Sequence, residues 1–428
     1  MLNSKLDIQR LGPWPLGINN VEAETNRVFA VPGNGDPPAQ LRTAVNVDID
    51  KEGWPRRRAG RVKRLDLVNG HSGTSVAGMQ LHVSDGNLMQ VMSDGTQDIL
   101  VPDIGNGKFN AVEVAGQVWW TNGDKTGAIV NGTPKPWGVL PPAPPNLSVA
   151  EGSMAAGIYL VAVTTEDDDG LESGAHAASV IELIQDGAIR LSGLPTDQPW
   201  INVYASGCNG RDLFWVIRIP AQPEFILTQV DQSTDLLENI GLYPPPPGQA
   251  LGLFVGRLLV ASGSALYWSQ PVDYHHFRLA TDVQMFPKRI DLLAILPAGF
   301  YVRSGTETVW IQGDDPETWT RSEVDDRPGA EGVMYIPGRK IPSIKEDGLL
   351  PVWVTADGPA VGLPGGHIVH LTDGRLAVDT YAEAAISYRE ENGLRQILMA
   401  LKDKSAGTKL GATDVASCTI TRINKPQP

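Results

Sequence analysis

Few residues of this chain have the type and spacing that metal binding or catalysis requires. The seven histidines give two possible metal groups, one over residues 273–276 (DYHH) and one over residues 367–373 (HIVHLTD). Neighbouring side chains on a strand point to opposite faces, and any odd spacing has the same effect. The paired histidines of either group are therefore badly placed to hold one ion together, and we predict no metal site.

An acidic stretch, Glu166–Gly170 (EDDDG), is similar to the start of a calcium-binding loop. In the EF-hand register, Gly170 at position six places Thr165 at position one and His176 at position twelve, where carboxylates are needed. We interpret the stretch as a hairpin turn in which Gly170 supplies the positive φ. The sequence also lacks the GxSxG, HExxH and P-loop motifs, and Cys208 has no suitable histidine nearby. We predict no catalytic residue and no cofactor.

The densest group of charges is basic and follows a predicted strand over residues 41–50 (LRTAVNVDID), which alternates apolar and polar side chains. Two interpretations stay open for this basic run. It is a solvated edge strand whose charges prevent sheet-to-sheet pairing, or it contacts DNA or the acidic surface of a neighbouring subunit. Its members are Arg56, Arg57, Arg58, Arg61, Lys63 and Arg64.

Composition excludes several classes of protein. A formal net charge of −14 over 428 residues opposes non-specific wrapping by nucleic acid. Two cysteines exclude a disulfide framework and a CxxC zinc site, and indicate a reducing folding compartment. No apolar run approaches the roughly 20 residues of a spanning helix, and the first residues lack the apolar region of a signal peptide. We therefore expect a protein without a membrane-spanning segment.

Five segments share one pattern, in which two short apolar runs flank a small polar turn with glycine. Each predicts a β-hairpin. Their marker glycines recur at intervals of about 40 to 50 residues, the length of a four-stranded propeller blade, with one much longer interval. We predict a β-propeller-like body, with an assembly of sandwiches as the alternative. The hairpins are expected at residues 81–92, 116–130, 256–269, 299–313 and 350–363, with markers Gly86, Gly123, Gly263, Gly305 and Gly358.

The long interval indicates an inserted domain. Proline-rich connectors at residues 136–146 and 239–249 bracket it. Between them, short alternating strands predict a small β-sandwich, with strands at residues 156–166, 178–184, 188–194, 200–206, 212–219 and 224–230. The expected fold is all-β, in four parts: an N-terminal arm with a basic hairpin (1–65), the first part of the propeller-like domain (66–140), the inserted sandwich (141–243), and the remainder with a C-terminal segment (244–428).

Tryptophan is frequent, with eleven residues, and several lie in the predicted hairpins: Trp119, Trp120, Trp268, Trp310 and Trp353. Packing between sheets is one explanation, and stacking on carbohydrate is the other.

Several segments together resemble the tail hub or nozzle proteins of tailed bacteriophages. They are LGPWPLGINN (11–20), LRTAVNVDIDKEGWPRRRAGR (41–61), GRLLVASGSALYWSQPVDYHHFRL (256–279), GFYVRSGTETVWIQGDDPETW (299–319) and LPVWVTADGPAVGLPGGHIVHLT (350–372). Residues 159–175 and 201–206 are similar to the fibronectin type III modules inserted into phage tail proteins. The resemblance covers residues 11–140 and 250–375 and leaves residues 376–428 uncovered.

The resemblance implies a non-enzymatic β-propeller component of the virion tail. It implies a homo-oligomer, a hexameric ring, that contacts portal or adaptor proteins and tail fibre or tail tip proteins. The ring surrounds DNA that passes during ejection without specific binding, and assembly in the host cytoplasm fits the unpaired cysteines. We expect subunit contacts from Trp14, Asn19, Arg56, Arg57, Arg58, Arg61 and Arg64, and an acidic channel lining that includes Asp314, Asp315, Asp325 and Asp326.

Two alternatives belong to other classes. One is a β-propeller tail protein that binds or hydrolyses glycan through its tryptophans and fibronectin-like module. The other is a receptor-binding fibre or decoration protein, which would form a trimer.

Overall fold

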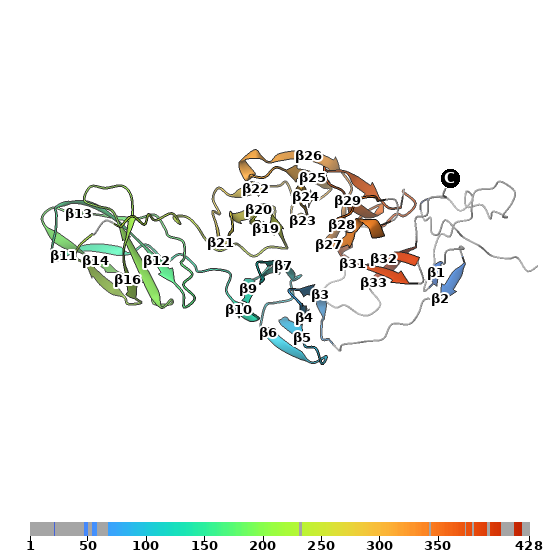
Figure 1. Cartoon of the computed structure of the whole chain (residues 1–428), viewed down its shortest axis with the longest axis horizontal. Helices are drawn as coiled ribbons and strands as arrows, with labels where there is room; N and C mark the ends of the chain where they lie inside the picture. The colour runs from blue at the N-terminus through green and yellow to red at the C-terminus, as the bar shows by residue number, and fades with distance from the viewer. Residues whose placement is uncertain are drawn as a thin grey trace, which may run out of the picture. The chain divides into compact units, whose positions relative to one another are not determined.

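The computed structural model consists of strands and turns, with two single-turn 3₁₀ helices, η2 (Pro316–Thr318) and η3 (Gly338–Lys340), among the described residues (Figure 1). This confirms the predicted all-β class. Contacts divide the chain into unit 1 (Met1–Asn69 with Lys288–Pro428) and unit 2 (Gly70–Pro287). The structure describes residues 21, 47–49, 54–57, 67–230, 233–341, 344–372, 374–378, 381–391, 394–403 and 415–421.

Unit 2 begins with two four-stranded antiparallel sheets in which each strand pairs with the next one along the chain. This is the strand arrangement of a propeller blade. The first sheet contains β3 (His71–Val76), β4 (Met79–Ser84), β5 (Asn87–Val91) and β6 (Gln97–Val101). The second contains β7 (Asn110–Val114), β8 (Gln117–Thr121), β9 (Thr126–Val130) and β10 (Thr133–Lys135).

A third sheet of the same kind follows only after the inserted domain, and it packs directly on the second. Thr121 Oγ1 and the Gly248 carbonyl lie 2.8 Å apart, and Asn110 Nδ2 donates to the Gln249 carbonyl at 2.9 Å. Sheets two and three are therefore neighbours, although more than 100 residues separate them in sequence. The third sheet contains β18 (Ala250–Phe254), β19 (Arg257–Ser262), β20 (Ala265–Gln270), β21 (Asp273–Phe277) and β22 (Val283–Met285).

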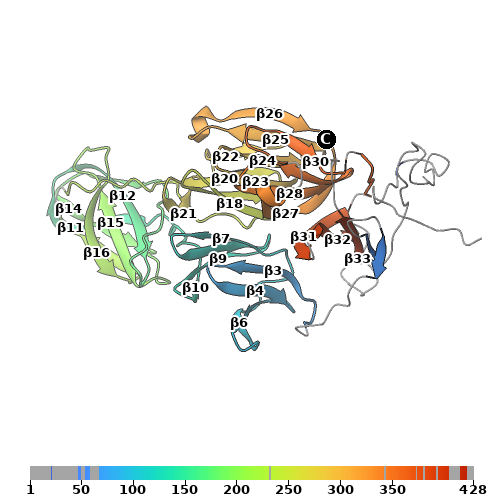
Figure 2. The same ribbon diagram turned by 45° about the vertical axis from the view of Figure 1, so that its right-hand side comes forward.

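The inserted domain is a sandwich of two antiparallel sheets (Figure 2), with strand orders β11-β14-β17 and β13-β12-β15-β16. Side chains such as Val161, Ile189 and Val203 fill its core. All six predicted strands are present, and β11 precedes them as a seventh that the sequence did not reveal. The strands are β11 (Asn146–Met154), β12 (Gly157–Glu166), β13 (Ser179–Leu183), β14 (Gly187–Ser192), β15 (Trp200–Ala205), β16 (Phe214–Pro220) and β17 (Glu224–Leu227).

The acidic stretch at the end of β12 forms the predicted turn. The Asp167 carboxylate accepts from the Asp169 and Leu171 amides at 2.9 and 2.8 Å, and Gly170 has a φ of +83°. Asp169 also forms an ion pair with Lys135 at the end of β10. The turn therefore ties the sandwich to the second sheet of unit 2.

Unit 1 contains a four-stranded sheet and a seven-stranded sheet of order β30-β29-β28-β27-β31-β32-β33. The first holds β23 (Ile290–Leu296), β24 (Gly299–Ser304), β25 (Glu307–Gln312) and β26 (Thr320–Asp325). The second holds the meander β27 (Gly329–Pro337), β28 (Leu349–Thr355), β29 (Gly358–Gly362) and β30 (Ile368–His370). Three further strands extend it: β31 (Tyr381–Glu391), β32 (Leu394–Asp403) and β33 (Val415–Thr421).

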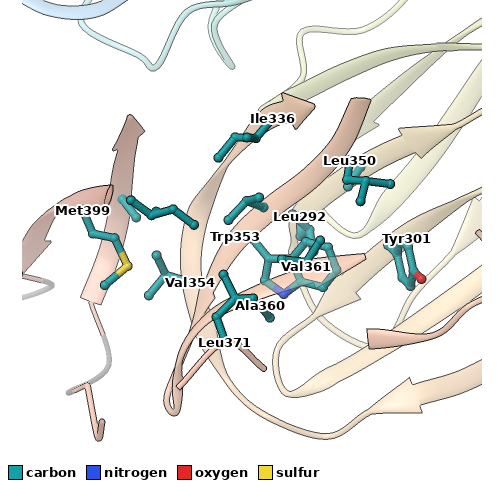
Figure 3. Close-up of a cluster of buried hydrophobic side chains, with 14 of the residues drawn as sticks. Leu292, Tyr301, Ile336, Leu350, Trp353, Val354, Ala360, Val361, Leu371 and Met399 are labelled. Carbon is teal, nitrogen blue, oxygen red and sulfur yellow. The ribbon is translucent and has the colours of Figure 1, made fainter. Parts of the chain in front are cut away.

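One apolar core joins the strands of unit 1 (Figure 3). Leu292 from β23, Trp353 from β28 and Met399 from β32 are all buried in it. Strands β31 and β32 are thus part of the core, although the sequence made no prediction for them.

All five predicted hairpins are present, each as the second and third strands of a four-strand meander. Four of their marker glycines lie in the connecting turns and Gly358 directly follows its turn as the first residue of β29, and all five have φ between 59° and 90°. With five such meanders in the described part of the chain, the body is β-propeller-like, as predicted. The alternating pattern and the turn glycine were sufficient because both are local features.

Excising the sandwich tests whether it is an independent insertion. A Cβ placed on Gly138 would lie 3.4 Å from Pro244 Cγ, so the two connectors meet. We expect a chain in which a short Gly-Ser linker replaces residues 141–243 to keep the β8–β19 packing. It loses the exposed Lys135–Asp169 pair, worth at most about 1 kcal/mol, and the contacts of β21 with the Glu172 carbonyl and the Tyr243 backbone, none of which involves β8 or β19. Hydrogen exchange of β8 and β19 amides measures this. Loss of protection in both strands would show that the sandwich is an integral part of unit 2.

Candidate subunit-contact site

The described part of the N-terminal arm is a small antiparallel hairpin, β1 (Val47–Ile49) with β2 (Pro55–Arg57). Asp48 on β1 lies directly opposite Arg56 on β2. Arg56 and Arg57 are exposed, as expected for residues that meet a partner or solvent. We refer to residues 47–57 as the arm hairpin.

A polar contact fixes the arm hairpin to the C-terminal strands of unit 1. Arg389 Nη2 donates to Asp48 Oδ2 at 2.7 Å, and Gln396 Nε2 donates to Asp48 Oδ1 at 3.3 Å. Arg389 Nε also donates to Gln396 Oε1 at 2.8 Å. Only 13% of the Asp48 side chain is exposed. A carboxylate that is largely withdrawn from water needs such partners, so this contact decides where the arm hairpin docks.

Sequence reasoning found the arm but missed this contact. Asp48 was expected on the polar face of a strand over residues 41–50, of which only residues 47–49 are described as strand. Arg389 lies in the part of the chain for which nothing was predicted, 341 residues from Asp48. The remaining predicted contact residues lie outside the described part of the chain: Trp14, Asn19, Arg58, Arg61 and Arg64.

The four aspartates expected in a channel lining do not form one group. Asp314 and Asp315 precede β26, whereas Asp325 and Asp326 end it, so the two pairs lie about 20 Å apart along the strand. Asp314, Asp315 and Asp326 are exposed. The Asp315 carboxylate also accepts from the Glu317 amide at 2.9 Å, which caps η2.

Asp325 differs from the other three because its side chain is 2% exposed. Arg327 Nη1 donates to it at 2.6 Å, and Arg327 Nε donates to Asp357 at 2.5 Å. The hydrogen bond to Asp357 and, to a smaller extent, the one to Asp325 raise the pKa of Arg327 above its ordinary value. Asp325 thus holds the turn between β26 and β27 in place, and the expectation that it faces a channel does not fit its burial.

His370 completes this cluster. Its Nε2 lies 3.1 Å from Arg327 Nη1 and 3.6 Å from Asp325 Oδ2. Burial, followed by the charge of Arg327, lowers the pKa of His370 below its ordinary value. A neutral imidazole beside this guanidinium adds no charge, so Arg327 is the cation that the two carboxylates of the turn share.

The paired histidines on β21 have separate environments. His276 Nδ1 is 2.7 Å from Asp273 Oδ2, and its Nε2 is 3.1 Å from the Glu172 carbonyl. The His275 ring packs edge-on against Trp119 at 4.8 Å between centroids. Among the described residues, no group of three or more His, Cys, Asp or Glu side chains is arranged to hold a metal ion.

The hairpin tryptophans are mainly core residues. Trp119, Trp120, Trp310 and Trp353 are buried, and Trp268 is half-buried. Four of the five are therefore unavailable for stacking on a carbohydrate ring, and their role is packing between and within sheets. Over the residues that the structure describes, no helix combines the length and hydropathy that crossing a membrane requires.

Comparison with known proteins yields weak likenesses. No protein-family model and no curated protein matches this sequence. Three solved structures cover most of this chain, each with a TM-score of 0.28. PorZ, a surface component of the type-IX secretion system of Porphyromonas gingivalis, is 11% identical over 78% of this chain, which spans 35% of PorZ. The AfRom2 CNH domain is 7% identical (84% of this chain, 98% of that domain), and the Neurospora crassa Pan2 WD40 domain is 8% identical (74% and 82%). None of these values bears on the family or function of this chain.

Proposed function

We propose that this chain is a non-enzymatic structural protein of a bacteriophage tail, one subunit of a hexameric hub or nozzle ring around the DNA exit channel. The arm hairpin is the observation that carries the proposal. It is a short segment that docks through Asp48 and presents Arg56 and Arg57 at the surface. Such an arm suits a head-to-tail contact that closes a ring by rotation. The resemblance of residues 11–140 and 250–375 to tail hub proteins supports the same assignment.

The charge of the protein suits a passage for DNA. A net charge of −14 repels phosphates, so the polyanion slides without being held. The exposed aspartates at the two ends of β26, Asp314, Asp315 and Asp326, are the described candidates for the wall of this passage. Portal or adaptor proteins on one side and tail fibre or tip proteins on the other would complete the conduit, in a virion tail assembled in the host cytoplasm.

The charged groups of the body support a structural role. The largely buried carboxylates of Asp291 and Asp325 both pair with arginines that join successive strands of unit 1. A buried pair such as Asp291–Arg303 costs free energy to desolvate and fixes one arrangement of the strands. Such pairs serve the shape of the body, which is what a ring subunit needs.

The mass of the native assembly tests the proposal. We expect six copies, arranged as a ring in electron micrographs, and we expect the double substitution Arg56→Glu and Arg57→Glu to leave a folded monomer that no longer closes the ring. The exposed pair Arg190–Glu224 on the sandwich offers a control, since Arg190→Glu should leave the ring intact. Three copies or one, or reproducible release of oligosaccharide from host polysaccharide, would contradict the proposal.

A further inference from the structure

The C-terminal strands carry a preformed site for a carboxylate. Arg389 on β31 and Gln396 on β32 lie directly opposite each other, and the Arg389 Nε to Gln396 Oε1 bond at 2.8 Å orients both side chains. Gln396 Nε2 and Arg389 Nη2 both donate to Asp48, one to each carboxylate oxygen. Each oxygen of the carboxylate accepts one bond, and this paired geometry distinguishes a carboxylate from other groups. We call Arg389 and Gln396 the arm receptor.

The receptor is part of the folded body rather than of the arm. Gln396 is 1% exposed, and its strand β32 contributes Met399 and Leu401 to the core of unit 1. The arm hairpin, in contrast, has three residues in each strand. A two-stranded ribbon of that size is not stable alone in water, so it forms where it docks. The receptor therefore exists before the arm arrives and selects it.

The connection of the arm to the body allows docking on more than one copy. Residues 58–66 separate the arm hairpin from Leu67, and β3 of unit 2 starts at His71. Nine residues span at most about 30 Å. That reach is comparable to the width of a small domain, so exchange requires the receptor of an adjacent copy to lie within about 30 Å of Leu67. A short element with a defined receptor and a spanning linker is the usual requirement for exchange between identical subunits.

We propose that the arm hairpin is exchanged: Asp48 of one copy binds the Arg389–Gln396 receptor of the next copy around the ring. This inference rests on the proposed ring and names the contact that closes it. It gives residues 381–403 a function as the receiving surface. It adds a contact of opposite polarity to the one expected, because an acidic arm residue enters a basic site while Arg56 and Arg57, exposed on the other strand of the hairpin, are left to meet the acidic surface of the same neighbouring copy.

Charge reversal of the two partners separates exchange from docking within one chain. Asp48→Arg places two cations together, and Arg389→Asp places two carboxylates together, so neither variant alone should form the ring. Mixing the two purified variants restores both pairings if arms are exchanged. The arm of the Asp48→Arg copy meets the receptor of the Arg389→Asp copy as Arg against Asp, and the reverse contact is the natural Asp against Arg. An alternating ring of three plus three copies then closes.

Native mass spectrometry, with one variant isotope-labelled, reads the result. We expect monomers from each variant and a hexamer with three labelled copies from the mixture. Circular dichroism establishes that both monomers are folded, and the double variant Asp48→Arg with Arg389→Asp should assemble by itself. Rings from either single variant, or a double variant that assembles while the mixture does not, would overturn the exchange. So would monomers from both the mixture and the double variant. If the natural protein forms no ring, the proposed function fails first, and this outcome is distinct from the others.

Discussion

Replacing Arg303 by methionine should destabilise the strands β23 to β28 by about 3–5 kcal/mol. Arg303 is 0% exposed, and its guanidinium donates to Asp291 Oδ1 at 2.7 Å and to the Ala330 carbonyl at 2.8 Å. A further bond at 3.3 Å reaches the Val354 carbonyl. The side chain thus joins β24 to β23, β27 and β28. Methionine fills much of the volume but leaves the Asp291 carboxylate without its buried counterion.

The loss should depend on pH in a defined direction. Burial raises the pKa of Asp291 above its ordinary value, against the opposing effect of Arg303. A carboxyl whose pKa is higher in the folded state than in the unfolded state stabilises the fold most at a pH below the unfolded-state pKa of about 3.9. This contribution is lost as the pH rises through the folded-state pKa. Without Arg303 the folded pKa rises further. The destabilisation should therefore be full at about pH 7.5 and smaller at about pH 4.5.

Urea unfolding of the natural chain and the variant at both pH values measures the effect, and hydrogen exchange of β24 and β28 amides locates it. Arg321→Met is the matched control, because Arg321 pairs with Glu307 in the same sheet with both side chains about one-third exposed. That surface pair is worth at most about 1 kcal/mol. Equal losses for the two variants, or a loss that does not change with pH, would show that Asp291 needs no counterion.

The features predicted correctly from the sequence are local ones. A dipeptide such as Asp85-Gly86 between apolar runs fixes a tight turn, because both residues must adopt positive φ, and the turn fixes the register of its two strands. Strand β11 was missed because its residues are mostly exposed and only Met154 is buried, which removes the alternation that a half-buried strand shows. Local signals therefore sufficed for the five hairpins and for the sandwich strands that have a buried face.

The candidate site depends on pairs that no local pattern contains. Asp325 and Asp326 are adjacent and chemically identical in sequence, yet Asp325 is buried with Arg327 as its partner while Asp326 is exposed. The Asp48–Arg389 pair joins residues 341 positions apart. From the sequence alone, a carboxylate is expected at the surface. It is buried only where a partner compensates its charge, and hydrophobic periodicity does not reveal that partner.

Trp353→Ala should be the most damaging apolar substitution in unit 1, with a loss of about 3–5 kcal/mol. Trp353 is 0% exposed, and its ring centroid lies 5.3 Å from that of Tyr301, which in turn lies 4.7 Å from Trp310. The ring stack spans β24, β25 and β28. A Cβ placed on Gly362 would lie 2.5 Å from the Tyr301 ring and 2.8 Å from the Trp353 indole, so the backbone of β29 already touches both rings.

This close packing decides the size of the loss. The β29 backbone cannot move into the space of the missing indole without breaking its ladder to β28, so alanine leaves a cavity. Leu349→Ala on the same strand is the control: its side chain is 59% exposed, and the change should cost less than about 0.5 kcal/mol. The loss of stability for Trp353→Phe should lie between these two values. The smaller ring destabilises the core by its lost volume, but the change also removes an indole N–H that has no acceptor among the described residues. Hydrogen exchange of β28 and β29 amides ranks the three variants. A loss for Trp353→Ala no greater than that for Leu349→Ala would mean that unit 1 repacks around the cavity, and that its core is held by the strand ladders rather than by the ring stack.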